Sequence, residues 1–433
     1  MLIIIHSETN QHTIAQNLGR SEYSYYFVLK EYRPVLERLG RVVEVADPQR
    51  EVDALYLECL SRGEPCVFLS FSPPHRTPVH LACPTLPVFA WEFSTIPNEA
   101  FAGEPRNDWR SVLHACGAAI THSSYTVNAV REAMDADYPI VAVPAPVWDR
   151  FAARGAQSQG QASPESFRLK IKGLVADSRT LDLNAFGPKH LRSGKGIDFA
   201  APVTEQELLL DGVVYTSVFN PGDGRKNWED MLSAFCVSFR EVDDATLVLK
   251  LTHHDAEEAL GDILHHLYKN QSYRCRIVLI YGYLADADYE QLVQATRYVV
   301  NTSYGEGQCL PLMEFMSCGK PAVAPHTTAM IDYLSADNAF LIESTDELTA
   351  WPHDPRKAFR TLRYATNWAS LCQAYEASYD VAKNHPARYA QMAAHAVSSL
   401  QGFCSQAVAE QRLQAFFAQL FERHTATVET PQA

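Results

Sequence analysis

Two glutamates separated by seven residues stand out as side chains that could do chemistry. Glu306 lies in a Tyr-Gly-Glu-Gly turn, and Glu314 lies one turn into a helix predicted to begin at Pro311. Proline is favoured at the first helical position, where its missing N–H costs nothing. A carboxylate among apolar neighbours needs a hydrogen-bond donor, and a ribose diol supplies two. The pattern predicts a polar ligand, although capping or local pairing would also satisfy Glu314.

The same stretch could hold an anion through its backbone. A strand ending at Thr302 leads into a loop containing Gly305 and Gly307, and then into the helix. The N–H groups at a helix N-terminus favour negative charge, and ligands of an open parallel sheet lie beyond the carboxyl ends of its strands. We expect the anion to face the amides of Gln308, Cys309 and Leu310.

A second loop, Asn220–Trp228, carries two adjacent cations. It follows the strand-like run Val213–Val218, opens a helix, and contains Arg225 and Lys226. An arginine offers a planar fork and a lysine a point charge, so the pair suits a diphosphate. Such a pair is more often simply solvated, but its position at a strand end favours ligand binding.

The elements that must position these loops form two blocks in which strands alternate with helices. This alternation predicts two doubly wound, Rossmann-like α/β domains with parallel sheets. We expect a first domain over residues 1–205 and a second domain over 206–385. Helices over 386–433 should pack back on the first domain and end in a polar tail.

A basic segment interrupts the alternation at about residues 150–205, which we interpret as a linker or insertion. Residues 168–195 hold seven Lys or Arg against two Asp. A solvated linker is the simpler interpretation, and a weak contact with a membrane or an anionic acceptor is the other. The net charge of the whole chain is −14, which disfavours a nucleic-acid partner.

Ten scattered cysteines without a CxxC pair indicate buried thiols in a reducing compartment. The apolar N-terminal run Met1–Ile5 lacks a basic leader, so we expect a first strand rather than a signal peptide. We therefore predict a cytoplasmic protein, with a peripheral position at the inner membrane as the second option.

The segment Tyr298–Pro325 resembles the E-x7-E signature of glycosyltransferase family 4, whose members are retaining enzymes of the GT-B architecture. The resemblance implies that the two domains face a central cleft, with an acceptor-binding domain over residues 1–205 and a donor-binding domain over 206–385. The resemblance extends loosely over about Val213–Ile342. It implies that Glu314 holds the donor ribose, that Glu306 contacts the donor sugar, and that the intervening amides contact diphosphate and sugar. The family usually has an arginine at the strand end and a lysine several residues later, and Lys226 matches the position of that lysine. Phe219 or Asn220 stands where the family has a strand-end arginine, for which Arg225 could substitute.

The function implied by this resemblance is that of a retaining, metal-independent glycosyltransferase of the hexosyltransferase class without a cofactor. It would move a sugar from a nucleotide-diphosphate sugar to a glycan or glycolipid hydroxyl, in bacterial surface polysaccharide or glycolipid assembly. Two alternatives stay open: a nucleotide-sugar 2-epimerase-like isomerase, and a non-catalytic nucleotide-sugar-binding protein. The Asp286-Ala-Asp288 triplet spells a manganese motif, but Asp286 begins a predicted helix and is better interpreted as its N-cap.

The first domain offers three further candidates. Arg20 lies in the loop after the first strand, where this family often contacts acceptor and phosphate, and His75 and Glu92 follow later strands. His75 or Glu92 could occupy the place of the family's sugar-contacting histidine, whereas a solvated loop is the simpler interpretation for His75. The pair His253-His254 lacks an HExxH context, and we expect it to be structural.

Overall fold

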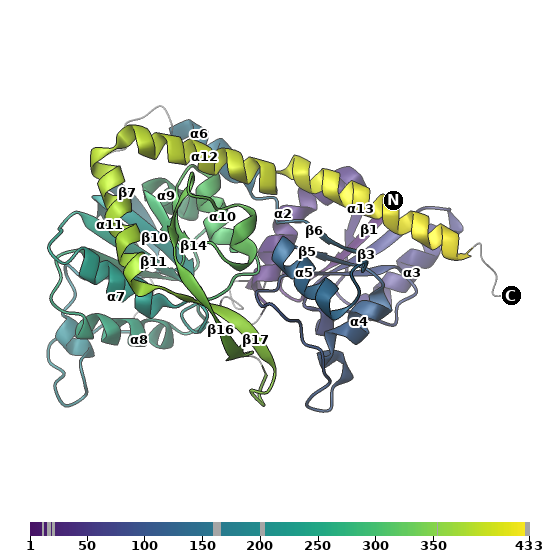
Figure 1. The fold of residues 1–433 in the computed structure, drawn as a ribbon, viewed down its shortest axis with the longest axis horizontal. Coiled ribbons are helices and arrows are strands. Elements are labelled where there is room, and N and C mark those ends of the chain that lie inside the picture. Colours follow the sequence, from purple (N-terminus) through teal and green to yellow (C-terminus); the bar gives the residue numbers. More distant parts are fainter. Residues whose placement is uncertain are drawn as a thin grey trace.

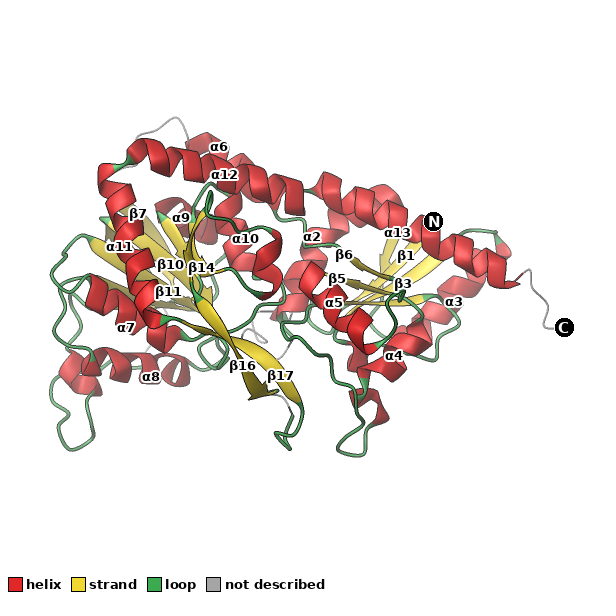
Figure 2. Ribbon diagram, in the orientation of Figure 1, coloured by secondary structure: helices red, strands yellow, loops and turns green. Residues whose placement is uncertain are grey.

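The computed structural model describes residues 1–10, 13–14, 19, 22–158, 166–199, 204–352 and 354–428. They form two open sheets with helices on both faces, bridged along one side by long C-terminal helices (Figures 1 and 2).

The first sheet is entirely parallel, in the order β2-β1-β3-β4-β5-β6. Its strands β1, β3 and β4 are buried almost throughout, as expected when helices cover both faces. The strands are β1 (Leu2–His6), β2 (Arg41–Glu44), β3 (Cys66–Phe71), β4 (Thr85–Phe89), β5 (Ala119–Thr121) and β6 (Ile140–Ala142). The helices are α2 (Ser24–Leu39), α3 (Pro48–Ser61), α4 (Trp109–Cys116), α5 (Ser124–Ala133) and α6 (Trp148–Ser158).

The second sheet has the order β15-β14-β13-β10-β11-β12-β8, and only its edge strand β8 is antiparallel to its neighbour. Its strands are β8 (Leu174–Asp177), β10 (Val213–Phe219), β11 (Ala245–Leu251), β12 (Arg276–Tyr281), β13 (Tyr298–Val300), β14 (Ala322–Pro325) and β15 (Ala339–Ile342). The helices are α7 (Trp228–Ser238), α8 (Ala256–Lys269), α9 (Asp286–Ala295) and α10 (Leu310–Ser317), with the 3₁₀ turn η4 (Thr328–Asp332).

The described part of the basic segment forms strands, where we expected a linker or insertion. Strand β7 (Ser166–Lys172) pairs along its full length with β9 (Glu205–Asp211), and β8 joins the second sheet. Arg168 pairs with Glu207 and Lys170 with Glu205, so acidic partners on β9 neutralise part of the basic run. The alternation of exposed cations with buried Leu169 and Ile171 is the period-2 pattern of a strand, which the basic composition obscured.

Two further features differ from what the sequence predicted. The antiparallel hairpin β16 (Ser344–Ala350) and β17 (Arg360–Thr366) projects from the second domain, as Figures 1 and 2 show. Helix α13 (Gln406–Val428) continues into the segment expected to be a polar tail, whose last residues, 429–433, lie outside the described part.

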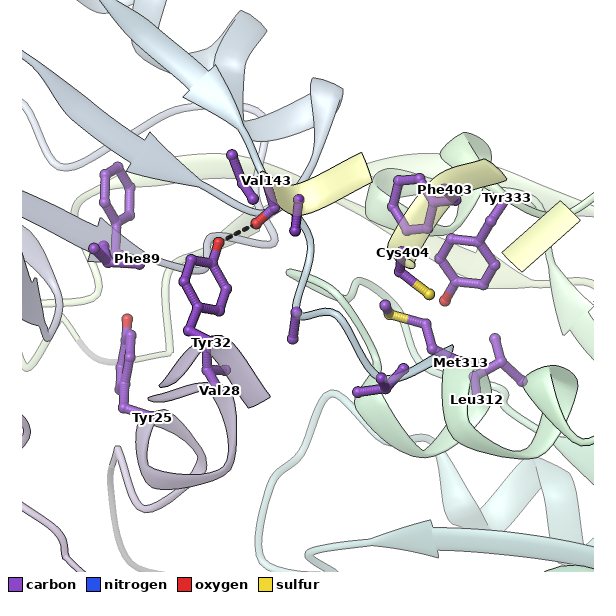
Figure 3. Packing of buried hydrophobic residues seen from close by; sticks show 14 of the residues in the cluster. Tyr25, Val28, Tyr32, Phe89, Val143, Leu312, Met313, Tyr333, Phe403 and Cys404 are labelled. Atoms are coloured by element: carbon purple, nitrogen blue, oxygen red, sulfur yellow. Dashed lines mark hydrogen bonds between the residues drawn. The ribbon is translucent and has the colours of Figure 1, made fainter. Parts of the chain in front are cut away.

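The C-terminal helices join the two domains. After α11 (Trp368–Asn384), α12 (Pro386–Cys404) packs on α10 and α6, and α13 packs on α2 of the first domain. Figure 3 shows the apolar cluster that results, from Tyr25, Tyr32 and Phe89 on one side to Met313 on α10. The Tyr32 hydroxyl donates a hydrogen bond to the carbonyl of Val143. The apolar core therefore runs continuously from one domain to the other.

Within the described residues, every helix is too short or too polar to cross a bilayer.

Candidate active site

The centre of the site is the side chain of Glu306, held in the loop between β13 and α10. Its Oε1 atom accepts hydrogen bonds from Lys226 Nζ at 2.6 Å, Ser303 Oγ at 2.6 Å and Asn301 Nδ2 at 3.0 Å. Its Oε2 atom has no hydrogen-bond partner among the described residues. The carboxylate is thus oriented through one oxygen while the other is left for a ligand.

The charges of this pair stabilise one another. Burial raises the pKa of Glu306, but Lys226 and Arg225 outweigh this effect and hold the pKa below its usual value. Burial lowers the pKa of Lys226, and Glu306 more than restores it. Both groups are therefore ionised at neutral pH. The Lys226 ammonium has three N–H donors and uses one on Glu306, which leaves donors for a phosphate.

Backbone strain is concentrated around this pair. Three of the six described non-glycine residues with a positive φ lie around it: Asn227 at 49°, Cys309 at 61° and Thr328 at 50°. Asn227 follows Lys226, Cys309 precedes α10, and the Thr328 hydroxyl accepts a hydrogen bond from the Glu306 amide at 2.9 Å. Such conformations cost about 1–3 kcal/mol each and cluster at functional sites. Their convergence on Glu306 therefore supports a ligand-binding role for this loop.

Arg225 bridges the two domains. Its guanidinium binds Asp223 through two hydrogen bonds of 3.1 and 2.7 Å, donates to the Gly305 carbonyl at 3.0 Å, and lies 3.1 Å from the Glu92 carboxylate. These contacts engage most of the five donors that an arginine has. The structure places Arg225 as a bridge, whereas Lys226 is the cation with unused donors.

The two glycines of the loop permit the close approach of the first domain. A Cβ atom on Gly305 would lie 2.9 Å from the Glu92 carbonyl oxygen. A Cβ atom on Gly307 would lie 2.9 Å from Ala90 Cβ and 3.0 Å from the Trp91 amide nitrogen. The segment Ala90–Glu92 therefore forms one wall against the loop.

The backbone amides that we expected to bind an anion lie at the start of α10. Among the described residues, none accepts a hydrogen bond from the amides of Gln308, Cys309 or Leu310. The helix begins at Leu310, one residue before the predicted Pro311. The Gln308 side chain accepts a hydrogen bond from the Ala145 amide at 2.6 Å, so it fixes this turn against the first domain.

Asn220 connects the cation loop to the first domain. Its Nδ2 atom donates to the Gly19 carbonyl at 2.8 Å, and its Oδ1 atom accepts from the Gly222 amide at 3.0 Å. Gly19 belongs to the predicted loop after the first strand, but Arg20 in that loop lies outside the described residues.

Glu314 has a local partner. Its Oε2 atom accepts a hydrogen bond of 2.6 Å from the Tyr289 hydroxyl on α9. Burial raises the pKa of Glu314 to about 7, the Tyr289 bond opposes this, and the neighbouring Glu31 adds to it. The local pairing considered from the sequence is therefore present. A ribose contact would use the other carboxylate oxygen.

His75 lies away from this cluster. Its ring stacks on Trp109 at 5.9 Å between centroids, and burial lowers its pKa to about 4. The charged groups that act on it are Arg76, Arg106 and two glutamates of the first domain. The ring packs inside the first domain, so His75 is not the solvated loop histidine that the simpler interpretation predicted. It also makes no contact with Glu306 among the described residues. Of the two candidates of that domain that lie among the described residues, Glu92 is the one that contacts Arg225.

Asp286 forms interdomain ion pairs. It lies 3.0 Å from Lys30 and 3.1 Å from Arg150, and Arg150 also pairs with Glu31 at 3.1 Å. The N-cap residue of α9 is Ala285, so the predicted capping role of Asp286 is wrong. Lys30 and Arg150 therefore supply the positive charge that pairs with the Asp286 carboxylate.

Several residues of the site were not identified from the sequence. Asp223 lies inside the cation loop, and Asn301 and Ser303 precede Glu306. These polar residues next to strand ends could have been identified from the sequence as candidates for the site. Thr328 and Tyr289 gave no such signal, because they reach the site from η4 and α9 through tertiary packing.

The hairpin reaches across to the first domain beside this site. Trp351 lies 5.6 Å from Trp91 and 6.0 Å from Phe359 between ring centroids. Arg356 pairs with Glu99 at 2.9 Å, and the Ser94 hydroxyl accepts from the Leu362 amide at 3.2 Å. The hairpin therefore fixes the segment that carries Trp91 and Glu92 against the second domain.

Residues 213–351 match the family model of Glycosyl transferases group 1. No curated protein matches the chain in sequence. The assignment to family 4 and the E-x7-E signature stay predictions.

Several solved structures resemble this chain over nearly its whole length. A sucrose-phosphate synthase from Thermosynechococcus elongatus has 12 % identity and a TM-score of 0.56, covering 98 % of this chain and 100 % of its own. A glycosyltransferase from Rickettsia africae has 10 % identity and a TM-score of 0.53, covering 97 % and 98 %. Anabaena HepE in complex with UDP-glucose has 11 % identity and a TM-score of 0.53, covering 97 % and 100 %. These likenesses show the GT-B fold, and the predicted fold class is confirmed.

Proposed function

We propose that this chain is a retaining, metal-independent glycosyltransferase that moves a sugar from a nucleotide-diphosphate sugar to a hydroxyl acceptor. The observation that carries the proposal is the Lys226–Glu306 pair. One carboxylate oxygen is held by three donors while the other has no partner among the described residues, and the ammonium retains unused donors. A sugar hydroxyl suits the carboxylate oxygen and a phosphate suits the ammonium.

The donor would lie along the loop that follows β13. Its diphosphate would contact Lys226 and the amides of Gln308, Cys309 and Leu310, and its ribose would contact Glu314. Glu92 pairs with Arg225, and Glu306 pairs with Lys226, so each carboxylate has a cation that lowers its nucleophilicity. We therefore favour attack by the acceptor hydroxyl on the face from which the diphosphate departs. The new bond joins the acceptor oxygen to the anomeric carbon, the bond to phosphate breaks, and the leaving phosphate takes the hydroxyl proton.

The task of the protein in this reaction is to stabilise charge that grows on the diphosphate. Lys226 and the N-terminus of α10 supply donors in a site that is already charged and oriented, so little reorganisation is needed. Loss of one such contact typically raises the barrier by about 3–4 kcal/mol. Arg225 contributes by holding Glu92 and Gly305 in place.

The first experiment is a thermal-shift panel of UDP-, GDP- and ADP-sugars, since a bound donor stabilises the fold by mass action. UDP-glucose is the first member to try, because it is the ligand in the HepE structure named above. A panel without any shift would count against the proposal.

The second experiment follows nucleotide release with and without acceptor hydroxyls. A transferase releases nucleotide faster when an acceptor is present, an isomerase converts the donor without releasing it, and a binding protein does neither. The product anomer, determined by NMR, tests retention, and activity in EDTA tests independence from metal. Assembly of surface polysaccharide or glycolipid in the bacterial cytoplasm is the context that we propose for the acceptor.

A further inference from the structure

Two histidines and a glutamate converge where β11 meets α8. His253 and His254 follow the strand, and Glu258 lies in the first turn of the helix. One ligand atom from each side chain lies within 4.8 Å of the other two, and His253 Nε2 lies 3.9 Å from Glu258 Oε1. The two imidazole rings lie 4.3 Å apart between centroids. The sequence pattern gave no metal motif here, because these ligands are spaced at i, i+1 and i+5.

Asp255 holds the His253 ring in one orientation. The Nδ1 atom of His253 lies 2.9 Å from the Asp255 carbonyl oxygen and 3.1 Å from the Asp255 amide nitrogen, and the side chain is only 5 % exposed. In the tautomer with the proton on Nδ1, this proton is donated to the carbonyl and the lone pair of Nε2 is free, which is the usual outer contact of a ligating histidine. The Nε2 atom points to the Glu258 side.

The position of Glu258 is also set by the fold. The Asp255 side chain caps α8 by accepting a hydrogen bond of 2.9 Å from the Glu258 amide. The Glu258 carboxylate itself is exposed, with 66 % of its side chain accessible, and His254 is exposed as well. One buried, oriented ligand and two adaptable ones can close on an ion with small side-chain movements.

We propose that His253, His254 and Glu258 bind one zinc ion. Two imidazoles and a carboxylate suit zinc better than magnesium or calcium, which prefer oxygen ligands. Zinc bonds to nitrogen and oxygen of about 2.0–2.2 Å place the ligand atoms of a tetrahedral site about 3.3–3.6 Å apart. The three ligand atoms lie within 4.8 Å of one another, and His253 Nε2 lies 3.9 Å from Glu258 Oε1, so the side chains must move closer to bind the ion. Three protein ligands leave the fourth position for water.

The ion would reinforce a contact between the domains. A Cβ atom on Gly19 would lie 2.6 Å from His253 Cα, so the loop of the first domain packs directly on this backbone. A Cβ atom on Gly222 would lie 3.3 Å from His253 Nε2. By tying the end of β11 to α8, zinc would hold the surface against which Gly19 and the cation loop pack. The role is structural, and the inference does not rest on the proposed function.

The test is a calorimetric titration of the full chain with zinc chloride at pH 7.5, after dialysis against EDTA and its removal. We expect one ion per chain, with affinity at least about tenfold lower in His254→Ala and in Glu258→Gln. Glu257→Gln is the matched control, because it removes the same charge from the neighbouring exposed position and should leave the affinity unchanged.

Cobalt supplies a second readout of the same site. Bound Co²⁺ should show the intense visible absorption of a tetrahedral nitrogen and oxygen site in the parent chain and in Glu257→Gln, and should lose it in His254→Ala. The proposal is overturned if zinc does not bind with saturation, or if all variants bind it equally. Nucleotide release measured in EDTA should be unchanged by Glu258→Gln, so failure of the zinc site and failure of the transferase proposal can be told apart.

Discussion

Replacement of Lys226 by methionine separates the structural and the ligand-binding roles of the ion pair. Methionine keeps a long apolar stem but removes the charge, so Glu306 is left buried, with 5 % exposure, without its cation. Removing one partner of a buried pair costs about 3–5 kcal/mol. Asn301 and Ser303 still donate to the carboxylate, so we expect the lower end of this range in urea unfolding at pH 7.

The pH dependence of this loss has a defined sign. The pKa of Glu306 is lowered in the folded chain, so the stability that the pair contributes is present above the unfolded value of 4.5 and is lost as the pH falls through the folded value. The difference in stability between the parent chain and Lys226→Met should therefore shrink as the pH is lowered below about 4.5.

Turnover gives the second measurement. If Lys226 contacts the departing diphosphate, Lys226→Met should lower kcat by about 10²–10³-fold. The double variant Lys226→Met/Glu306→Gln removes both charges and should regain most of the lost stability, because no unpaired charge is left buried. Its turnover should stay low. Recovery of turnover together with stability, or near-normal turnover in Lys226→Met, would refute the assignment of Lys226 to the donor.

Three further predictions follow from other parts of the site. Burial raises the pKa of Glu314 to about 7, so the parent chain should lose up to about 3 kcal/mol of stability as the pH rises from 4.5 through 7. Urea unfolding of Glu314→Gln should show no such loss over the same pH range. Calorimetry with free nucleotide should show weaker binding by this variant. Gly305→Ala should lower turnover at least about tenfold, because its Cβ would lie 2.9 Å from the Glu92 carbonyl oxygen. The control is Gly261→Ala, which has open space around the new Cβ and should leave stability unchanged or raise it by about 0.5–1 kcal/mol. Trp351→Ala should cost about 3–5 kcal/mol in thermal or urea unfolding if the hairpin is packed as described, and a loss below 1 kcal/mol would contradict that packing.

The alternation of apolar runs with helical periodicity was enough to predict two doubly wound domains. Parallel strands buried on both faces, such as Cys66–Phe71 and Ala245–Leu251, read as short continuous apolar segments between turn residues. The cation loop and the Glu306 loop were identified for a related reason, since the carboxyl ends of parallel strands are where ligands gather.

The antiparallel pairs β7–β9 and β16–β17 were not predicted, because their sequences are not continuous apolar runs. Strand β7 alternates apolar residues with lysine and arginine, and β16 and β17 are largely polar. Each is stabilised by its partner strand rather than by its own composition. Between β7 and its partner β9 the chain forms β8 and the 3₁₀ turn η3 (Leu183–Phe186). Pairing between distant segments leaves little trace in a local window of sequence.

The sequence by itself determined which residue types stand at the strand ends, and hence that an acidic turn and a pair of cations face one edge of the second sheet. Tertiary structure alone decided which groups pair there. Lys226 and Glu306, 80 residues apart in the chain, share a hydrogen bond, while Arg225 turns instead to Asp223 and to Glu92 of the other domain. The physical reason is that hydrogen bonding selects partners by distances near 3 Å and by direction, and these are set by how the domains pack, whereas residue type and spacing specify only what each loop can offer.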